Sequence, residues 1–258
     1  MKVVILAGGF GTRISEESQF KPKPMIDIGG MPILWHIMKE YSSYGFYEFI
    51  ICAGYKQDVI KQWFSNYALI TSDVTFDFSN NNKMIVHNNR TEPWKITVVD
   101  TGISTQTGGR IKRIKDYIGS ETFMVTYGDA VGDIDISKLL SYHRSHGKIG
   151  TVSVYNFGQN KGVLDIEGGY VKAFREKSDL DGDLINIGFM VFEPSFFDYI
   201  AGDETVLEKD PMEALVASEQ LMAYTHQGYW QCMDTLREKE KIEKLWANGK
   251  APWKLWND

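Results

Sequence analysis

A glycine-rich segment close to the N-terminus carries the residue types that hold polyphosphates. Residues 8–11 contain three glycines and follow the β-branched run 3–6, which predicts a buried first strand ending in a turn. Because glycine lacks a Cβ atom, the backbone N–H groups of such a turn can approach phosphate oxygens closely. Arg13 and Lys23 add two cations that can face the same oxygens. The segment therefore predicts a polyphosphate site, the alternative being a glycine-rich surface turn with solvated charges.

The two standard phosphate-binding loops do not fit this segment. A Walker loop ends in Gly-Lys-Ser/Thr, and no such ending follows Gly11. The dinucleotide fingerprint requires a third glycine at the position where Ile14 stands. The pattern thus argues against a standard ATPase loop and makes a NAD-dependent dehydrogenase the least favoured class.

Two aspartates follow apolar runs farther along the chain. Asp129 comes after the predicted buried strand 123–127, and Asp234 comes after the short apolar run 229–233. In open α/β sheets, ligands collect outside the carboxyl ends of the strands, which places Asp129 well for Mg²⁺. Two carboxylates brought together can share one hard cation, which keeps its other positions for phosphate oxygens and water. Either aspartate alone is more simply explained as a turn or helix-cap residue.

Apolar periodicity predicts an α/β chain that forms a single domain, residues 1–258. A helix is predicted over 32–43, a strand over 49–53 and a second amphipathic helix over 59–67. The alternation of strands and helices is typical of a parallel sheet with crossover helices. We therefore expect a Rossmann-like sheet, mixed but mostly parallel, flanked by helices.

Two segments depart from this alternation. Strand-like runs at 74–78 and 84–86 are joined by an Asn-rich turn, and a further strand is predicted over 96–99. They predict a small β-rich insertion at about residues 71–100. Near the other end, Thr235 is a natural cap for a charged helix, which predicts a helical tail at about 235–258.

Composition narrows the classes of partner. The 258 residues are 43% hydrophobic and carry a net charge of −6, which argues against a nucleic-acid or anionic-membrane surface. Cys52 and Cys232 are too few for a disulfide scaffold and have no metal-ligand spacing. The N-terminus reads as a strand, and no apolar run of about 18 residues is present. We expect a cytoplasmic protein.

Residues 6–13, followed by Lys23-Pro24-Met25, resemble the signature of the sugar-1-phosphate nucleotidylyltransferases. Further segments resemble the cytidylyl branch of that family: residues 28–38, 101–102, 107–110, 231–237 and 249–254. The resemblance implies the nucleotide-diphospho-sugar transferase fold. It also implies transfer of a cytidylyl group from CTP to α-D-glucose 1-phosphate, with CDP-glucose and pyrophosphate as products, for CDP-deoxysugar and O-antigen synthesis. Mg²⁺ as the cofactor and a homo-oligomer, a hexamer, are implied in the same way.

The resemblance also implies roles for individual residues. Arg13 and Lys23 would stabilise the leaving pyrophosphate, Lys177 would act on the sugar phosphate, and Asp129 and Asp234 would hold Mg²⁺. Other substrate-binding positions implied by the family are Leu6, Ala7, Gly8, Gly9, Phe10, Gly11, Thr12, Ser104, Gly109, Arg110, Gly128, Glu176, Asn186 and Gly188.

The chain departs from the family pattern at two positions. Ser178 stands where proline usually follows the Glu-Lys step, and Ala130 stands where Gly-Asp-Gly is usual. An alanine that needed positive φ at that point would cost about 1 kcal/mol.

Three other functions stay open. The same chemistry could use dTTP or UTP, or the chain could be a catalytically silent, nucleotide-sensing homologue. A glycosyltransferase could use Asp133-Ile134-Asp135, a segment that is more simply the polar start of a helix.

Overall fold

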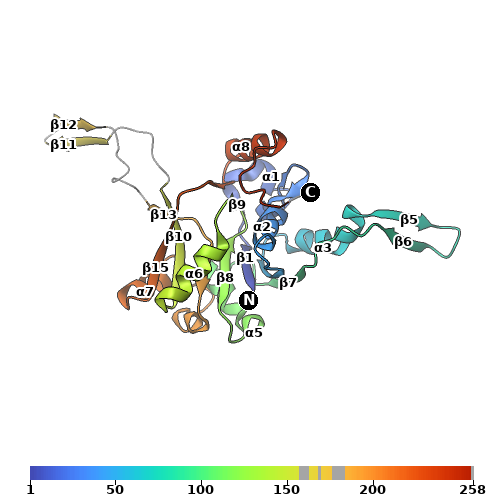
Figure 1. Ribbon diagram of the computed structural model, residues 1–258, viewed down its shortest axis with the longest axis horizontal. Helices are drawn as coiled ribbons and strands as arrows, with labels where there is room; N and C mark the ends of the chain where they lie inside the picture. Colours follow the sequence, from blue (N-terminus) through green and yellow to red (C-terminus); the bar gives the residue numbers. More distant parts are fainter. Residues whose placement is uncertain (157–162, 168–169, 176–183, 257–258) are drawn as a thin grey trace.

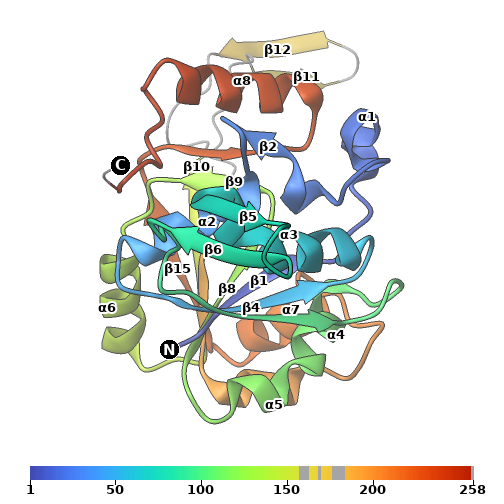
Figure 2. The ribbon, with the colours of Figure 1, turned by 90° about the vertical axis from the view of Figure 1, so that its right-hand side faces the viewer.

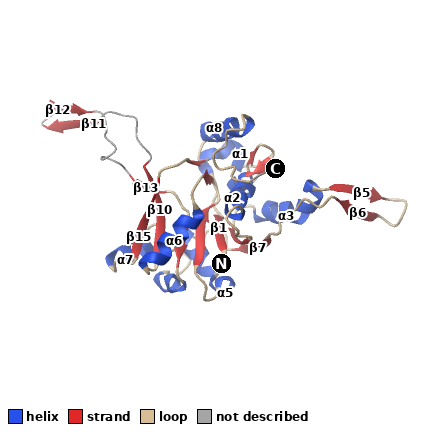
Figure 3. Cartoon of the chain, viewed as in Figure 1, coloured by secondary structure: helices blue, strands red, loops and turns tan. Residues whose placement is uncertain are grey.

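The computed structural model describes residues 1–156, 163–167, 170–175 and 184–256. Its centre is an eight-stranded sheet (Figures 1 and 3). The strands are β1 (Val3–Ala7), β4 (Glu48–Ala53), β7 (Lys95–Asp100), β8 (Phe123–Tyr127), β10 (Gly150–Asn156), β13 (Leu184–Asn186), β14 (Met190–Phe192) and β15 (Leu221–His226). Neighbours β8, β1, β4 and β7 are parallel, whereas β14 runs antiparallel to both β8 and β10. The expected mixed, mostly parallel sheet is confirmed.

Strand β1 lies in the middle of the sheet and is buried on both faces. Val3, Ile5 and Ala7 pack into one hydrophobic cluster, and Val4 and Leu6 pack into a second on the opposite face. A strand covered on both sides needs apolar side chains at every position, which is why its sequence does not alternate with polar residues.

Helices supply the two outer layers (Figure 2). On one face lie α2 (Ile33–Ser42), α3 (Gln57–Thr71) and α6 (Ile136–His146); on the other lie α4 (Thr107–Arg113), α5 (Lys115–Ile118), α7 (Asp210–Ala217) and the 3-10 helix η4 (Pro194–Tyr199). α8 (Leu236–Ala247) packs near the short ladder of β2 (Asp27–Ile28) and β3 (Met31–Pro32). Among the described residues, none of the helices has the length and apolar character needed to span a bilayer.

Two hairpins extend the molecule. β5 (Asp73–Asp77) and β6 (Lys83–His87) project beyond α3 (Figure 1). They fall within the predicted insertion, but the insertion is narrower than 71–100 because β7 belongs to the central sheet, where it pairs with β4. β11 (Val163–Glu167) and β12 (Tyr170–Arg175) form the second hairpin.

His36 of α2 anchors the C-terminal tail. Its Nε2 donates to the carbonyl of Ile28 at 2.8 Å, and its Nδ1 accepts from Trp253 Nε1 at 3.4 Å. Trp246 stands edge-on to the imidazole at 4.5 Å between ring centroids, and Trp253 is fully buried. Burial lowers the pKa of His36 to about 4, so the imidazole is neutral near pH 7.

This buried imidazole predicts a pH-dependent stability. In the unfolded chain the pKa returns to about 6.5, so the unfolded state binds the proton first as the pH falls. The His36 contribution is complete above pH 6.5 and is lost between pH 6.5 and pH 4, on the order of 3 kcal/mol in total. Urea unfolding of the wild type and of His36→Gln at several pH values measures it. We expect a flatter pH profile for the variant, and identical profiles would contradict the prediction.

Candidate active site

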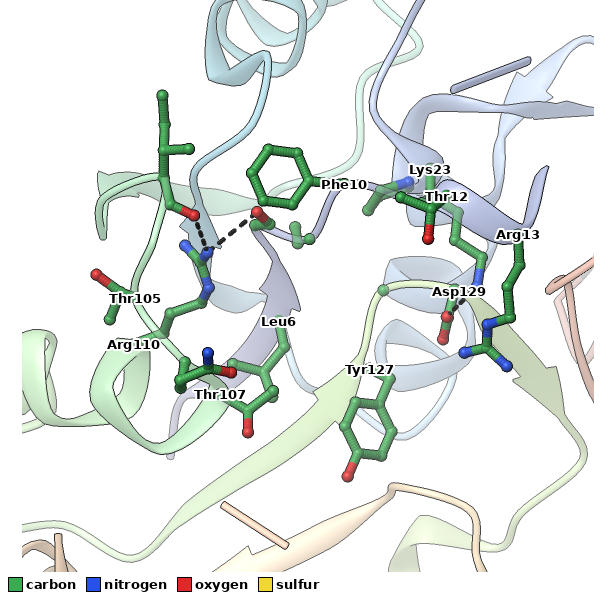
Figure 4. Close-up of a pocket in the computed structure, with 18 of the residues that line it drawn as sticks. Leu6, Phe10, Thr12, Arg13, Lys23, Thr105, Thr107, Arg110, Tyr127 and Asp129 are labelled. Carbon is green, nitrogen blue, oxygen red and sulfur yellow. Dashed lines mark hydrogen bonds and ion pairs between the residues drawn. The ribbon is translucent and has the colours of Figure 1, made fainter. Parts of the chain in front are cut away.

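A cavity of about 440 Å³ opens at the carboxyl ends of β1 and β8 (Figure 4). Its wall combines the glycine-rich loop, the loop before α4, and the ends of the two strands. The lining residues are Leu6, Ala7, Gly8, Gly9, Phe10, Gly11, Thr12, Arg13, Lys23, Pro24, Ile103, Ser104, Thr105, Gln106, Thr107, Arg110, Tyr127, Gly128, Asp129 and Asp234. The sequence-predicted residues in this list are thus brought together at one end of the sheet.

Two glycines of the loop are required by their surroundings. Gly11 has φ of 65°, in the left-handed region, and precedes the 3-10 helix η1 (Thr12–Ile14) and the short helix α1 (Ser15–Ser18). At Gly8, a Cβ atom would lie 2.1 Å from the guanidinium of Arg110. The loop therefore presents backbone without side chains to the cavity, and it packs against the buried side chain of Arg110.

Lys23 stands between the two aspartates. Its Nζ lies 2.6 Å from Asp129 Oδ2 and also donates to Asp234 Oδ1 (Figure 4 shows Lys23 meeting Asp129). Arg13 Nη1 lies 2.6 Å from the other oxygen, Asp234 Oδ2. Burial disfavours the Lys23 ammonium, but the charges and hydrogen bonds of both aspartates outweigh it and raise the pKa of Lys23 above its ordinary value.

A short antiparallel ladder explains why the aspartates meet. β9 (Ala130–Gly132) pairs with β16 (Trp230–Cys232), with Ala130 opposite Cys232. Asp129 precedes β9 and Asp234 lies just beyond β16, so both leave the ladder at the same end, where Met233 N donates to the Asp129 carbonyl at 2.8 Å. Asp234 lies between β16 and α8, a helix that Thr235 caps with a capping box. Asp129 instead lies between two strands.

Ala130 does not strain this arrangement. It is a buried residue of β9, and the positive φ values of the described chain occur elsewhere. The departure from Gly-Asp-Gly thus carries none of the left-handed backbone penalty that the sequence led us to consider.

Arg110 is committed to the backbone around the cavity. Its guanidinium donates to the carbonyls of Gly8, Ala53, Gly102 and Ile103 at 3.1, 3.3, 2.7 and 3.2 Å, and to Thr101 Oγ1 at 2.7 Å. These acceptors lie at or just after the carboxyl ends of three strands, β1, β4 and β7. The side chain lines the cavity, but its donors hold the loops that form the wall.

We expect Arg110→Lys to destabilise the fold by about 3 kcal/mol and to raise KM for the nucleotide, since an ammonium cannot replace the planar fork and leaves buried carbonyls unpaired. Urea unfolding and steady-state kinetics measure the two effects. Full stability with a raised KM alone would instead assign Arg110 to direct contact with the substrate. Arg144→Lys, the same substitution at an exposed arginine of α6, is the matched control and should change neither quantity.

Several sequence-predicted residues lie apart from the cavity. Gly109 sits within α4 against the backbone of Asp203, where a Cβ would lie 2.4 Å from the Asp203 carbonyl oxygen. Asn186 and Gly188 lie beyond Tyr127: Asn186 Nδ2 donates to Tyr127 Oη at 3.3 Å, and Gly188 N donates to Asn186 Oδ1 at 3.0 Å. Glu176, Lys177 and Ser178 lie outside the described residues.

Sequence reasoning missed part of the wall. Pro24, Ile103, Thr105, Gln106, Thr107 and Tyr127 line the cavity beside residues that were predicted. Behind them, Glu208 accepts from Tyr127 Oη at 2.5 Å and from Thr107 Oγ1 at 2.8 Å. The wall residues could have been found from their neighbours in sequence, whereas Glu208 has no local signal.

The segment Asp133-Ile134-Asp135 has structural duties. Asp135 is the N-cap of α6 and accepts from Lys138 N at 2.9 Å. Asp133 Oδ1 accepts from Tyr229 N at 2.6 Å and lies 3.1 Å from His226 Nε2. Both carboxylates are engaged, as expected for the polar start of a helix.

The glycine loop, two cations and two carboxylates share one cavity at the carboxyl end of the sheet, an arrangement suited to a polyphosphate. The family model described as nucleotidyl transferase matches residues 2–258, and the chain belongs to this family. Glucose-1-phosphate cytidylyltransferase of Salmonella typhi is 53% identical over 257 residues, covering 99% of this chain and 100% of the relative. The probable glucose-1-phosphate cytidylyltransferase of Bacillus subtilis (strain 168) is 43% identical over 257 residues, covering 99% and 100%.

Solved structures agree on the fold. A UDP-glucose pyrophosphorylase complexed with UDP-glucose superposes with a TM-score of 0.69 at 17% identity, covering 96% of this chain and 98% of that one. The nucleotide-diphospho-sugar transferase fold implied by the sequence is confirmed.

Proposed function

We propose that the protein transfers a cytidylyl group from CTP to α-D-glucose 1-phosphate and releases pyrophosphate. The observation that carries this proposal is 53% sequence identity over 257 residues to a glucose-1-phosphate cytidylyltransferase. The cavity of this chain also brings together the glycine loop, Arg13, Lys23 and both aspartates. The family model described as nucleotidyl transferase also matches nearly the whole chain, residues 2–258.

The reaction asks the protein mainly for position and charge. A phosphate oxygen of glucose 1-phosphate attacks the α-phosphorus of CTP, the bond from that phosphorus to the bridging β-oxygen breaks, and pyrophosphate leaves with its electron pair. Backbone N–H groups of the glycine loop would hold the nucleotide phosphates. Arg13 and Lys23 would stabilise the negative charge that develops on the departing pyrophosphate. Lys177, with Glu176, is proposed to hold the sugar phosphate.

Asp129 and Asp234 are proposed to hold Mg²⁺. Their carboxylates already converge on one cation, the Lys23 ammonium, and oxygen donors of this kind suit a hard divalent metal. When bound, Mg²⁺ would supply positive charge beside the phosphate oxygens. The protein's part is to hold the two carboxylates at one point.

A homo-oligomer, a hexamer by resemblance, completes the proposal. The β5–β6 hairpin supports it, because it carries the exposed apolar side chains Phe76, Phe78, Met84, Ile85 and Val86 away from the body of the subunit. Light scattering of the purified protein measures the mass. A cytoplasmic location is proposed on the composition and the few cysteines of the chain. A role in CDP-deoxysugar and O-antigen synthesis is proposed on the resemblance alone.

Pyrophosphate release tests the activity. The enzyme is offered glucose 1-phosphate and Mg²⁺ with CTP, UTP, dTTP, ATP or GTP separately. We expect release with CTP well above the others. Release mainly with dTTP or UTP would keep the mechanism and discard the cytidylyl assignment, and no release with any nucleotide would favour a silent homologue.

A further inference from the structure

Three of the four carboxylate oxygens of the proposed metal ligands already bind cations of the protein. Lys23 Nζ lies 2.6 Å from Asp129 Oδ2 and also pairs with Asp234 Oδ1. Arg13 Nη1 lies 2.6 Å from Asp234 Oδ2. The side chains of Lys23, Asp129 and Asp234 are 11%, 28% and 20% exposed. Partly buried ion pairs are screened less by salt than surface pairs.

The backbone that carries Lys23 is held firmly. Lys23 begins the 3-10 helix η2 (Lys23–Met25), with Pro22 before it and Pro24 after it, and Ile26 N donates to its carbonyl at 3.1 Å. Proline fixes φ and so stiffens the backbone on both sides. Arg13 differs, because its side chain is 73% exposed and can turn towards solvent or a ligand.

The cluster of two cations and two carboxylates is balanced in charge. A divalent ion arriving alone would need the oxygens that Lys23 and Arg13 hold, and it would repel both cations. Within the described ranges, no group of three or more His, Cys, Asp or Glu side chains is placed to hold a metal, so the remaining ligands must come from elsewhere. A triphosphate supplies oxygens both to the metal and to the two displaced cations.

We propose that Lys23 is an internal counter-ion that occupies the metal position between Asp129 and Asp234 until a nucleotide draws it to its phosphates. A divalent metal therefore binds weakly to the free enzyme and strongly with the nucleotide. The inference rests on the proposed function for the identity of the two metal ligands. Because coupling between two binding events is reciprocal, the metal strengthens nucleotide binding by the same factor.

Mn²⁺ binding without nucleotide, followed by the electron paramagnetic resonance of the free ion, tests this directly. Competition by an ammonium lowers the apparent affinity by the fraction of time the site is free, so we expect Lys23→Met to bind Mn²⁺ about tenfold or more tightly than the wild type. Lys23→Arg keeps the competing charge and should resemble the wild type. Lys21→Met is the matched control, because Lys21 pairs with Asp27 outside the cluster.

Adding Asp234→Asn to Lys23→Met should abolish the gained affinity, which locates the site. Equal Mn²⁺ affinity in the wild type and a folded Lys23→Met, or unchanged tight binding in the double variant, would overturn the proposal. If Lys23→Met fails to fold, Mn²⁺ binding to the wild type decides. Binding of one Mn²⁺ to the wild type that Asp234→Asn removes would overturn the proposal, and a wild type that shows no such binding would support it.

The same proteins separate this inference from the proposed function. Pyrophosphate release from CTP by the wild type, with no gain of Mn²⁺ affinity in Lys23→Met, refutes the counter-ion and keeps the enzyme assignment. If Lys23→Met gains Mn²⁺ affinity but the wild type turns over no nucleotide, the counter-ion is supported and the enzyme assignment is refuted.

Discussion

Asp234→Asn is expected to lower kcat for pyrophosphate release about a thousandfold or more, while the protein stays folded. Asparagine keeps the size of the side chain but removes one of two charges proposed to hold the metal. It also leaves Lys23 with Asp129 as its remaining carboxylate partner among the described contacts. Steady-state turnover at saturating CTP, glucose 1-phosphate and Mg²⁺ measures the effect, and circular dichroism checks the fold.

Glu240→Gln provides the matched control for Asp234→Asn. Glu240 is an exposed acid on α8, the helix that begins just after Asp234, so its removal changes the net charge equally without touching the cavity. Its kcat should match the wild type. An Asp234→Asn enzyme with undiminished kcat would take Asp234 out of the metal site.

Arg13→Ala is expected to lower kcat a hundredfold or more, with a smaller change in KM for CTP. An arginine that stabilises charge appearing on the leaving group acts mainly in the transition state, so its loss lowers kcat. The reverse reaction offers a second readout, because KM for pyrophosphate should rise. Stopped assays in both directions measure these values.

The geometry of the free enzyme sharpens the Arg13 experiment. Arg13 Nη1 is paired with Asp234 at 2.6 Å, so its guanidinium must turn its other donors to a pyrophosphate or give up that carboxylate. Arg237→Ala removes an exposed arginine from α8 and should leave kcat and the pyrophosphate KM unchanged. An intact kcat in Arg13→Ala would reassign Arg13 to holding Asp234 in place.

Local patterns predicted much of the sheet and its covering helices. The β-branched run of β1 and the apolar spacing of α2 and α3 are set by which faces must be buried, and burial is written into the sequence with a fixed period. The C-terminal boundary of the β-rich insertion could not be predicted in the same way. β7 is half-buried and resembles the hairpin strands in composition, so nothing local assigns it to the sheet.

The site was predictable only where its parts are contiguous or resemble a known motif. Gly8, Gly11 and Arg13 lie in one segment, but the meeting of Asp129 and Asp234 depends on pairing between β9 and β16, which spacing does not indicate. Arg110 illustrates the limit. The family resemblance implied a ligand contact for Arg110, whereas five acceptors at or just after the ends of β1, β4 and β7 take up its donors. Such competition between partners exists only in the folded chain.

The β9–β16 ladder sets a time at which the enzyme can first work during its synthesis. The glycine loop and Lys23 are synthesised first and Asp129 halfway along the chain, but Asp234 arrives only with the segment that follows β16. Until that segment pairs with β9, a nascent chain has one of the two carboxylates. Incomplete chains therefore lack the full charge cluster, so competence to bind the proposed metal–nucleotide complex comes late in translation.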